Sequence, residues 1–518
     1  MQDVNVEGFQ LSPQQRHLWK LTRERDSGSP YGAQCVVRIR GPVNLRTLRA
    51  AIDALPGRHE IIRTRFFAPE EVSTPFQVIA PVEAVTASVE YHDLTLVDTE
   101  RQASTIESIR EGSARALATD PTSHLIVHLV SLSAREHLLT IDVPGLRCDL
   151  AGMKNLVGDI VRCYEARVQS TALPEEGLQY PDVSIWLNDT LESPETSIGR
   201  RFWEQQDLSR YTTNRLPFEC EGAGETAFRP QRVAIRLDRE RLTAARLAAG
   251  EGSAEFFLLA CWQCLLQRTL DIESVAVSYL SDGRAYAELA SAVGLFARSL
   301  PLRGDLPAPV PFTEAMRRLG DSLREAKQWA ECLDWRLVPQ DRAGRTPFFP
   351  LVFERQDWHL RHAVEDVTFE IDDATACVDR FKLKLCCSGG PADLEDVWLE
   401  YDAGAFRQED VTRLAAQFET LFAAAVAAPA TPIGELRLLP NSEESEIVAQ
   451  CGRARTTAPA ALVHQRFETH VAASPGAMAV ACEEEHLTYA QLDTSSNQLA
   501  HRLQRIGVGP DVLVGLCI

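Results

Sequence analysis

Residues 137–161 read HLLTIDVPGLRCDLAGMKNLVGDIV. The run 137–143 is mostly apolar and ends in a Pro-Gly pair, which predicts a buried strand that stops at a turn. The preceding run 124–132, HLIVHLVSL, predicts the partner strand of a hairpin. Apolar residues recur at helical spacing over 152–168 and predict a helix. A strand, a turn that carries charged residues and a helix therefore follow one another directly.

Strand and helix patterns alternate on both sides of this stretch. Ser12-Pro13 is a typical helix start, with an N-cap residue before a proline at the first helical position. The further segments predicted are strands at 36–41, 231–238, 274–281, 380–388 and 396–402, and helices at 44–55, 240–250, 253–270 and 409–428. This alternation predicts an α/β (α+β) fold, and two halves of similar texture predict two lobes.

Charge and composition exclude several classes of function. The 518 residues include 53 basic and 73 acidic side chains, a net charge of −20, which argues against wrapping nucleic acid or lying on an anionic membrane. The opening stretch has no signal-peptide pattern, and no run approaches the ~20 apolar residues of a membrane span, so the cytoplasm is the expected location. The 13 cysteines lie mostly in apolar runs, and the Cys261-x-x-Cys264 pair is predicted to be core, so no metal site or disulfide is predicted.

The composition changes between Pro429 and Pro459, where proline, alanine and charge mix as in an interdomain linker. A new periodic segment follows and ends inside an apolar run, as a fragment of a longer domain would. The boundaries predicted are 1–179 for an N-terminal lobe, 180–440 for a C-terminal lobe, 441–460 for a linker and 461–518 for the start of a further domain.

Seven segments, in order, resemble the condensation domain of nonribosomal peptide synthetases and the adenylation domain that follows it. They are LSPQQRHLWKL (11–21), RHEIIRTRF (58–66), YPDVSIW (180–186), DGRAYAELASAVGLFARSLPLR (282–303), GRTPFFPLVF (344–353), LEYDAGAFRQEDVTRLAAQFETLF (399–422) and, for the adenylation domain, LTYAQLDTSSNQLAHRLQRIGVGPDVLVGL (487–516). The order of the segments makes the resemblance specific, although each segment alone is weak.

The resemblance implies two chloramphenicol-acetyltransferase-like lobes in a V-shaped pseudo-dimer. Donor and acceptor peptidyl carrier proteins would bring phosphopantetheine arms to a tunnel between the lobes, where an amine attacks a thioester and forms an amide. The arms are substrates, and no cofactor bound to the chain itself is implied. An adenylation domain in the same polypeptide would be the next partner. The adenylation fragment lacks that family's phosphate loop and catalytic lysine, so ATP binding is not expected.

The core motif of the family, His-His-x-x-x-Asp-Gly, is altered here. The strand and helix around it place PGLRCDL (144–150) on the motif, so Pro144 and Gly145 stand at the two histidine positions and Asp149 keeps the aspartate position. Gly145 therefore marks the missing catalytic histidine. Its loss is expected to open on the order of 100 Å³ at the tunnel centre.

Asp149 and Arg147 are the remaining core candidates. The resemblance implies that Asp149 pairs with an arginine of the RHEIIRTRF segment, Arg58 or Arg63, as a structural ion pair that is costly to break. Arg147 could face the tunnel and stabilise an oxyanion, although a solvated surface position is favoured. Cys148 has no flanking histidine to activate it as a nucleophile.

Three readings of the function stay open. The first is an acyltransferase-type amide synthase with an altered core, which could rely on positioning because a thioester is already activated. The second is a catalytically inactive platform that binds carrier proteins or recruits a tailoring enzyme. The third, a heterocyclisation domain, requires an aspartate at the position of Pro144, and Asp142 lies two residues too early. A tunnel that is open past residue 145 would favour catalysis. His124 and His128 are weak candidates for a substitute base.

Overall fold

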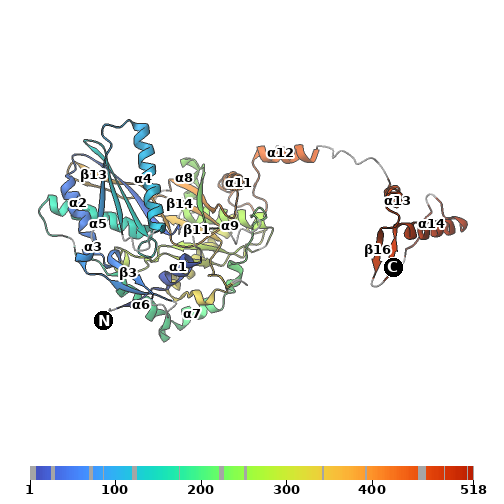
Figure 1. Ribbon diagram of the computed structural model, residues 1–518, viewed down its shortest axis with the longest axis horizontal. Coiled ribbons are helices and arrows are strands. Elements are labelled where there is room, and N and C mark those ends of the chain that lie inside the picture. The colour runs from blue at the N-terminus through green and yellow to red at the C-terminus, as the bar shows by residue number, and fades with distance from the viewer. Residues whose placement is uncertain are drawn as a thin grey trace. The chain divides into compact units, whose positions relative to one another are not determined.

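The computed structural model describes residues 8–24, 30–68, 74–85, 87–119, 125–173, 175–220, 227–249, 254–272, 274–340, 344–390, 394–452, 462–482, 485–509 and 512–516. The chain divides into two compact units, Met1–Pro440 and Asn441–Ile518. The first unit contains two large mixed sheets with helices packed on them (Figure 1).

The sheet of the N-terminal lobe has the strand order β12-β13-β2-β7-β6-β5. The bounds are β2 Gly32–Arg40, β5 Ser88–Asp93, β6 Ile126–Ser133, β7 Glu136–Pro144, β12 Arg361–Val364 and β13 Val367–Cys377. The predicted hairpin is present, because β6 and β7 pair antiparallel. Alternate residues of β2 face opposite sides of the sheet, so Val37 joins the core under α5 (Leu150–Val168) and Val36 joins the cluster under α4 (Thr99–Thr119).

The division of the lobes at residue 180 is too simple. Strands β12 and β13 lie within the range predicted for the C-terminal lobe, yet β13 pairs antiparallel with β2 from Thr368↔Arg40 to Cys377↔Gly32. The open edge of β2 is completed by a strand from far along the chain, because an unpaired edge leaves backbone groups without partners. Sequence periodicity could not reveal this pairing.

The sheet of the C-terminal lobe has the order β10-β9-β11-β14-β15-β8. The bounds are β8 Pro230–Ile235, β9 Val277–Ser281, β10 Arg298–Leu302, β11 Leu351–Gln356, β14 Leu383–Ser388 and β15 Asp396–Asp402. Helix α9 (Ala254–Leu270) contacts α8 (Arg239–Ala248), α10 (Phe312–Gln328) and α11 (Gln408–Ala427), and it is buried almost all round. Cys261 and Cys264 lie inside this core as predicted.

Besides β12 and β13, two further segments join the lobes. Helix α6 (Tyr180–Glu192), which begins with the YPDVSIW segment, contacts both η1 (Glu60–Arg63) and η6 (Ala330–Cys332). The Tyr180 hydroxyl contacts the Ser12 hydroxyl at 2.8 Å and donates to the carbonyl of Leu295. Residues 289–296, which form no strand, pack into the N-terminal core.

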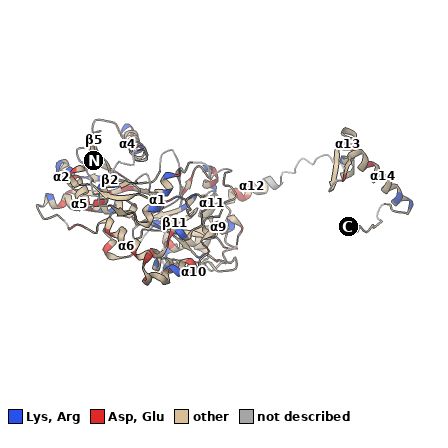
Figure 2. Cartoon of the chain, turned by 60° about the horizontal axis from the view of Figure 1, so that its bottom comes forward, with Lys and Arg blue, Asp and Glu red and all other residues tan. Residues whose placement is uncertain are grey.

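Local capping explains several helix starts. Ser12 caps α1 (Pro13–Arg23) in a capping box with Gln15, and Asn44 caps α2 (Leu45–Asp53). The smaller elements of the first unit are β1 Phe9–Gln10, β3 Thr64–Phe67, β4 Phe76–Ile79, α3 Leu55–Arg58 and α7 Ser197–Glu204. Lys and Arg are interspersed with Asp and Glu along the first unit (Figure 2).

The second unit begins with a helix. The predicted linker 441–460 starts as α12 (Asn441–Gly452), and its residues 453–460 lie outside the described ranges. The unit continues with α13 (Val463–Ala473), the hairpin β16 (Met478–Cys482) and β17 (Glu485–Thr488), and α14 (Tyr489–Arg505). Among the described residues of the whole chain, no helix has the length and apolar character to cross a membrane.

Candidate functional site

Asp149 caps helix α5 and joins the core segment to the segment that crosses between the lobes. Its carboxylate accepts hydrogen bonds from the backbone N–H groups of Gly152 (2.7 Å), Phe296 (2.8 Å) and Ala297 (2.9 Å). The Arg284 guanidinium approaches both carboxylate oxygens, with Nη2 2.9 Å from Oδ1 and Nη1 3.0 Å from Oδ2. Asp149 is 1% exposed. The residue is therefore a structural junction with every carboxylate oxygen engaged.

The predicted pairing of Asp149 with Arg58 or Arg63 is wrong. Arg58 binds Asp159 through Nε (2.6 Å to Oδ2) and Nη2 (3.2 Å to Oδ1), and Arg63 donates to the carbonyls of Pro56 and Ala80. Asp159 lies ten residues beyond Asp149, which is about 15 Å along helix α5. The arginines of the RHEIIRTRF segment lie beside this later part of the helix and do not reach its start.

Asp159 sits in a second buried charge cluster of the N-terminal lobe. His59 Nε2 lies 3.0 Å from Asp159 Oδ2, beside the Arg58 contacts. Burial would raise the pKa of Asp159, but the hydrogen bonds from His59 and Arg58 outweigh burial and hold its pKa well below the usual range. This cluster stabilises the packing of the 58–63 segment on α5.

Arg284 is the ion-pair partner of Asp149, and no sequence pattern singled it out. It lies in the loop after β9, within the quoted segment DGRAYAELASAVGLFARSLPLR. Its guanidinium also stacks over the Phe296 ring, 4.4 Å from the centroid. An arginine in a recognised family segment was the one sequence feature that could have pointed to this contact. Because Arg284 lies 135 positions from Asp149 in sequence, no local pattern paired the two residues.

Gly145 does not border an open space. Its N–H donates to the carbonyl of Tyr31 at 3.2 Å. A Cβ added at this position would lie 3.2 Å from Leu18 Cδ2, 3.2 Å from the Tyr31 carbonyl carbon and 3.3 Å from the Gly32 nitrogen. The volume expected from the missing histidine is closed because the start of β2 lies against the end of β7, where Gly32 pairs with Pro144.

Arg147 and Cys148 are both buried. The favoured surface position of Arg147 is wrong, because the residue is 1% exposed and its Nε donates to the carbonyl of Thr64 at 3.1 Å. Its guanidinium also lies 5.5 Å from the centroid of the Phe66 ring. Burial, followed by the charge of Asp149, raises the pKa of the Cys148 thiol well above its usual value, so this cysteine is a core residue and not a thiolate nucleophile.

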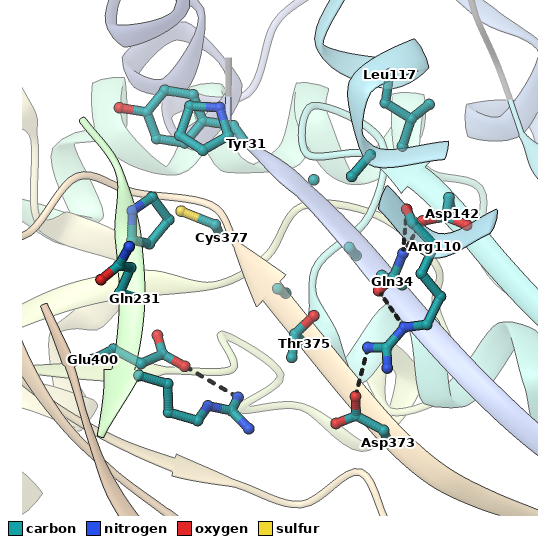
Figure 3. A pocket seen from close by; sticks show the side chains of 17 residues that line it. Tyr31, Gln34, Arg110, Leu117, Asp142, Gln231, Asp373, Thr375, Cys377 and Glu400 are labelled. Carbon is teal, nitrogen blue, oxygen red and sulfur yellow. Dashed lines mark hydrogen bonds and ion pairs between the residues drawn. The ribbon is translucent and has the colours of Figure 1, made fainter. Parts of the chain in front are cut away.

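The first of two cavities lies between the lobes and is named here the α4 cavity (Figure 3). It holds about 410 Å³ and is lined by residues of α4, β2, β7 and β13 on one side and of β8 and β15 on the other. Asp142 Oδ1 accepts from Gln34 Nε2 at 2.6 Å, and Arg110 Nε donates to Gln34 Oε1 at 3.1 Å. Burial raises the pKa of Asp142 to about 6. Asp142 is thus a cavity carboxyl that changes protonation near neutral pH.

The second cavity, named here the α5 cavity, holds about 380 Å³ beside the start of α5. Asp149, Arg284, Tyr279 and Glu354 are among its lining residues, and Ala376 lines both cavities. Gly145 is among the lining residues of neither cavity.

A buried ion-pair chain runs between the two cavities. Lys384 Nζ lies 2.6 Å from Glu354 Oε2, which lines the α5 cavity, and 2.9 Å from Glu400 Oε2, which lines the α4 cavity. Burial opposes the charge on Lys384, but these two carboxylates hold its pKa well above the usual value. The wall that separates the cavities is therefore charged and fully paired.

The two histidines considered as substitute bases do not supply one at the core. His128 lies on β6, where Nε2 contacts Ser113 Oγ at 2.9 Å and Nδ1 contacts His92 Nε2 at 3.1 Å, and it lines neither cavity. His124 lies outside the described residues.

Comparison with known proteins covers the whole chain. A condensation-domain family model matches residues 6–448, and an AMP-binding enzyme model matches residues 467–518. Chondramide synthase cmdD of Chondromyces crocatus is 28% identical over 522 residues, which cover 98% of this chain and 13% of the synthase. The chain spans between 8% and 14% of the length of such curated relatives.

Solved structures have the same fold. The condensation domain from monacolin K polyketide synthase MokA superposes with a TM-score of 0.70 at 18% identity, covering 83% of this chain and 99% of that domain. The X-domain from teicoplanin biosynthesis superposes with a TM-score of 0.67 at 23% identity, covering 84% of this chain and 99% of that domain. An AMP-binding enzyme model matches residues 467–518, and because the condensation-domain model matches residues 6–448, the chain belongs to the condensation-domain family.

Proposed function

We propose that the chain forms an amide between a carrier-bound acyl or peptidyl thioester and the amine of a carrier-bound acceptor in nonribosomal peptide synthesis. The supporting observation is a pair of cavities near the core segment 144–149. Tyr31 and Gly32, whose backbone lies against Gly145, line the α4 cavity, and Asp149 lines the α5 cavity. Two phosphopantetheine arms would approach through these two cavities. The match at residues 467–518 supports a linked adenylation domain as the neighbour in the polypeptide.

The chemistry requires little from the core. The amine nitrogen attacks the thioester carbonyl, the C–N bond forms, the C–S bond breaks, and the leaving thiolate takes up the proton that the amine releases. Because the thioester is already activated, holding the two arms in line supplies much of the rate. The ion pair of Asp149 with Arg284 serves this positioning by joining the two lobes at the α5 cavity.

We assign the handling of the amine proton to Asp142, a carboxyl that lines the α4 cavity. The acceptor amine arrives as an ammonium ion and must lose a proton before it attacks. Asp142 lines the α4 cavity with a pKa of about 6, so it exchanges protons near neutral pH. Along the strand it lies about 10 Å from residue 145, so it would act on the amine inside the cavity and not at the position of the missing histidine.

A second candidate function is the inactive platform. The enclosure of Gly145 by Leu18 and the backbone of Tyr31 favours it, because no open passage adjoins this position. A teicoplanin X-domain, which forms a complex with OxyB, has the same fold with a TM-score of 0.67. A heterocyclisation domain gains no support, because Pro144 occupies the required aspartate position.

A condensation assay with both loaded carrier proteins, followed by intact-protein mass spectrometry, tests these proposals. Wild type should form product, and Asp142→Asn should lower the rate and remove its dependence on pH near 6. Asp372→Asn is the matched control, because this aspartate lies on β13 and pairs with Arg38 away from the α4 cavity. Gly145→His should not raise product formation.

The opposite outcomes separate the alternatives. If wild type is inactive with every loaded pair while Gly145→His is active, the chain is a decayed catalyst. If neither forms product but the chain still binds a carrier or a tailoring enzyme, the platform function holds. If Asp142→Asn matches wild type at every pH, the role of Asp142 is refuted while amide synthesis stands.

A further inference from the structure

Three potential metal ligands converge on one face of the N-terminal sheet. Strands β5 and β6 pair in parallel with Glu90 opposite His128, and His92 lies two residues beyond Glu90, so all three side chains share a face. His92 Nε2 lies 3.1 Å from His128 Nδ1, and Glu90 Oε2 lies 3.4 Å from His128 Nδ1 and 4.0 Å from His92 Nε2. All three ligand atoms lie within 4.8 Å of one another.

The spacing suits a tetrahedral ion. Zinc binds histidine nitrogen and carboxylate oxygen at about 2.0–2.2 Å, so two ligand atoms of one tetrahedral site stand about 3.3 Å apart. The 3.1 and 3.4 Å separations agree with this value. A small rotation of the exposed Glu90 side chain would shorten the third separation, the 4.0 Å between Glu90 Oε2 and His92 Nε2. Carboxylate and imidazole ligands together suit a divalent transition metal better than Ca²⁺ or Mg²⁺, which prefer oxygen alone.

The hydrogen bonds behind His128 leave its inner nitrogen available. Ser113 Oγ lies 3.1 Å from the carbonyl oxygen of Ile109 and 2.9 Å from His128 Nε2. The His128 tautomer with its proton on Nε2 donates to Ser113 and leaves the Nδ1 lone pair facing His92 and Glu90. A hydrogen bond to the far ring nitrogen fixes the orientation of a metal-binding histidine, and the Ser113 hydroxyl lies in position to make one.

We propose that Glu90, His92 and His128 form a zinc-binding site with a fourth position open to water. This site is separate from the α4 and α5 cavities and does not depend on the proposed amide synthesis. No metal-ligand spacing signalled it in the sequence, because its ligands come from two neighbouring strands.

Bound zinc would stabilise the edge of the sheet. Strand β5 is the terminal strand of its sheet, so the ion would tie this edge to β6. Through Ser113 it would also hold helix α4, whose Arg110, Ala114 and Leu117 line the α4 cavity on the adjoining turns. Zinc should therefore raise the melting temperature of the first unit.

Zinc titration of the full chain after chelator treatment and dialysis tests the site. Calorimetry and metal analysis should give one tightly held Zn²⁺ per chain, and Co²⁺ in its place should give the visible absorption of a tetrahedral site. His92→Ala should abolish both signals. Glu90→Gln should weaken binding by at least the ~10–100-fold that loss of an outer-shell partner causes. His362→Ala is the control, since this partly exposed histidine pairs with Glu165 away from the cluster.

Equal zinc binding by wild type, His92→Ala and Glu90→Gln would overturn the proposal, because the metal would then sit elsewhere. Absence of binding by wild type would reduce the cluster to a hydrogen-bonded histidine pair. Far-ultraviolet circular dichroism establishes that each variant is folded, and Glu90→Gln, which changes a mostly exposed side chain, keeps the test valid if His92→Ala does not fold.

Discussion

Replacing Asp149 tests the junction between the lobes. The Asp149→Asn variant keeps the size of the side chain but removes its charge and turns one acceptor oxygen into a donor. The nitrogen would face either Gly152 N–H at the start of α5 or the N–H groups of Phe296 and Ala297, which all point at the carboxylate. At the same time, the 4%-exposed Arg284 side chain loses its counter-ion. We expect a large loss of stability with no change in fold.

The expected magnitude comes from these contacts. Removing one partner of a buried ion pair costs about 3–5 kcal/mol, and a backbone N–H left without an acceptor costs about 1–3 kcal/mol. These costs overlap, because the same carboxylate makes every contact, so they do not add in full. Asp149→Asn should therefore lower the free energy of unfolding by about 3–4 kcal/mol, and Asp149→Ala by about 1 kcal/mol more through loss of the helix cap.

Urea unfolding measures the stability, and hydrogen–deuterium exchange measures the junction itself. In Asp149→Asn the amides of residues 296 and 297 should exchange faster, because their acceptor is weakened. Asp159→Asn is the matched control: it breaks the buried pair with Arg58 within the N-terminal lobe and should leave exchange at 296–297 unchanged. If Asp149→Asn lowers the free energy of unfolding by less than about 1 kcal/mol, or leaves amide exchange at residues 296–297 unchanged, the assignment of Asp149 as the structural junction is refuted.

Position 145 and two buried aspartates give further tests. Gly145→Ala should lower the free energy of unfolding in urea by about 1–3 kcal/mol, because the added Cβ would crowd Leu18 and the Tyr31 backbone. An alanine variant as stable as wild type would contradict this packing. Burial raises the pKa of Asp159, but hydrogen bonds hold it below its value in the unfolded chain, so the free energy of unfolding of wild type should fall as the pH drops below about 4. Asp159→Asn should lose less stability over this acid range, and an equal loss in the variant would exclude Asp159 as the cause. Burial raises the pKa of Asp142 to about 6, so the free energy of unfolding of wild type should fall by about 3 kcal/mol as the pH rises from about 4 to about 6. Asp142→Asn should remove this fall, and equal pH profiles of unfolding in the two proteins would contradict the prediction.

The candidate site could be predicted only in part. The motif order located the core segment, in which Asp149 caps α5. Its predicted partners, Arg58 and Arg63, stand in a recognised segment, whereas the observed partner, Arg284, comes from the loop after β9. Arg147 was assigned to the surface because a charged side chain is usually solvated. A carbonyl acceptor and the ring of Phe66 compensate its burial, and neither is visible in sequence.

Local sequence patterns specify the hairpin β6–β7, the helices capped by Ser12, Asn44 and Asp149, and the buried helix α9. Each of these elements depends on the hydrophobic period and on capping residues within a few positions, so consecutive residues are enough to encode it. Which distant segments meet depends on the packing of the whole fold. The pairing of β13 with β2, the closure of the space at Gly145, the ion pair of Asp149 with Arg284 and the convergence of His92 with His128 all join residues through packing across the sheets. Because the free energy of such contacts arises from burial and geometry and not from sequence proximity, no local pattern could specify them.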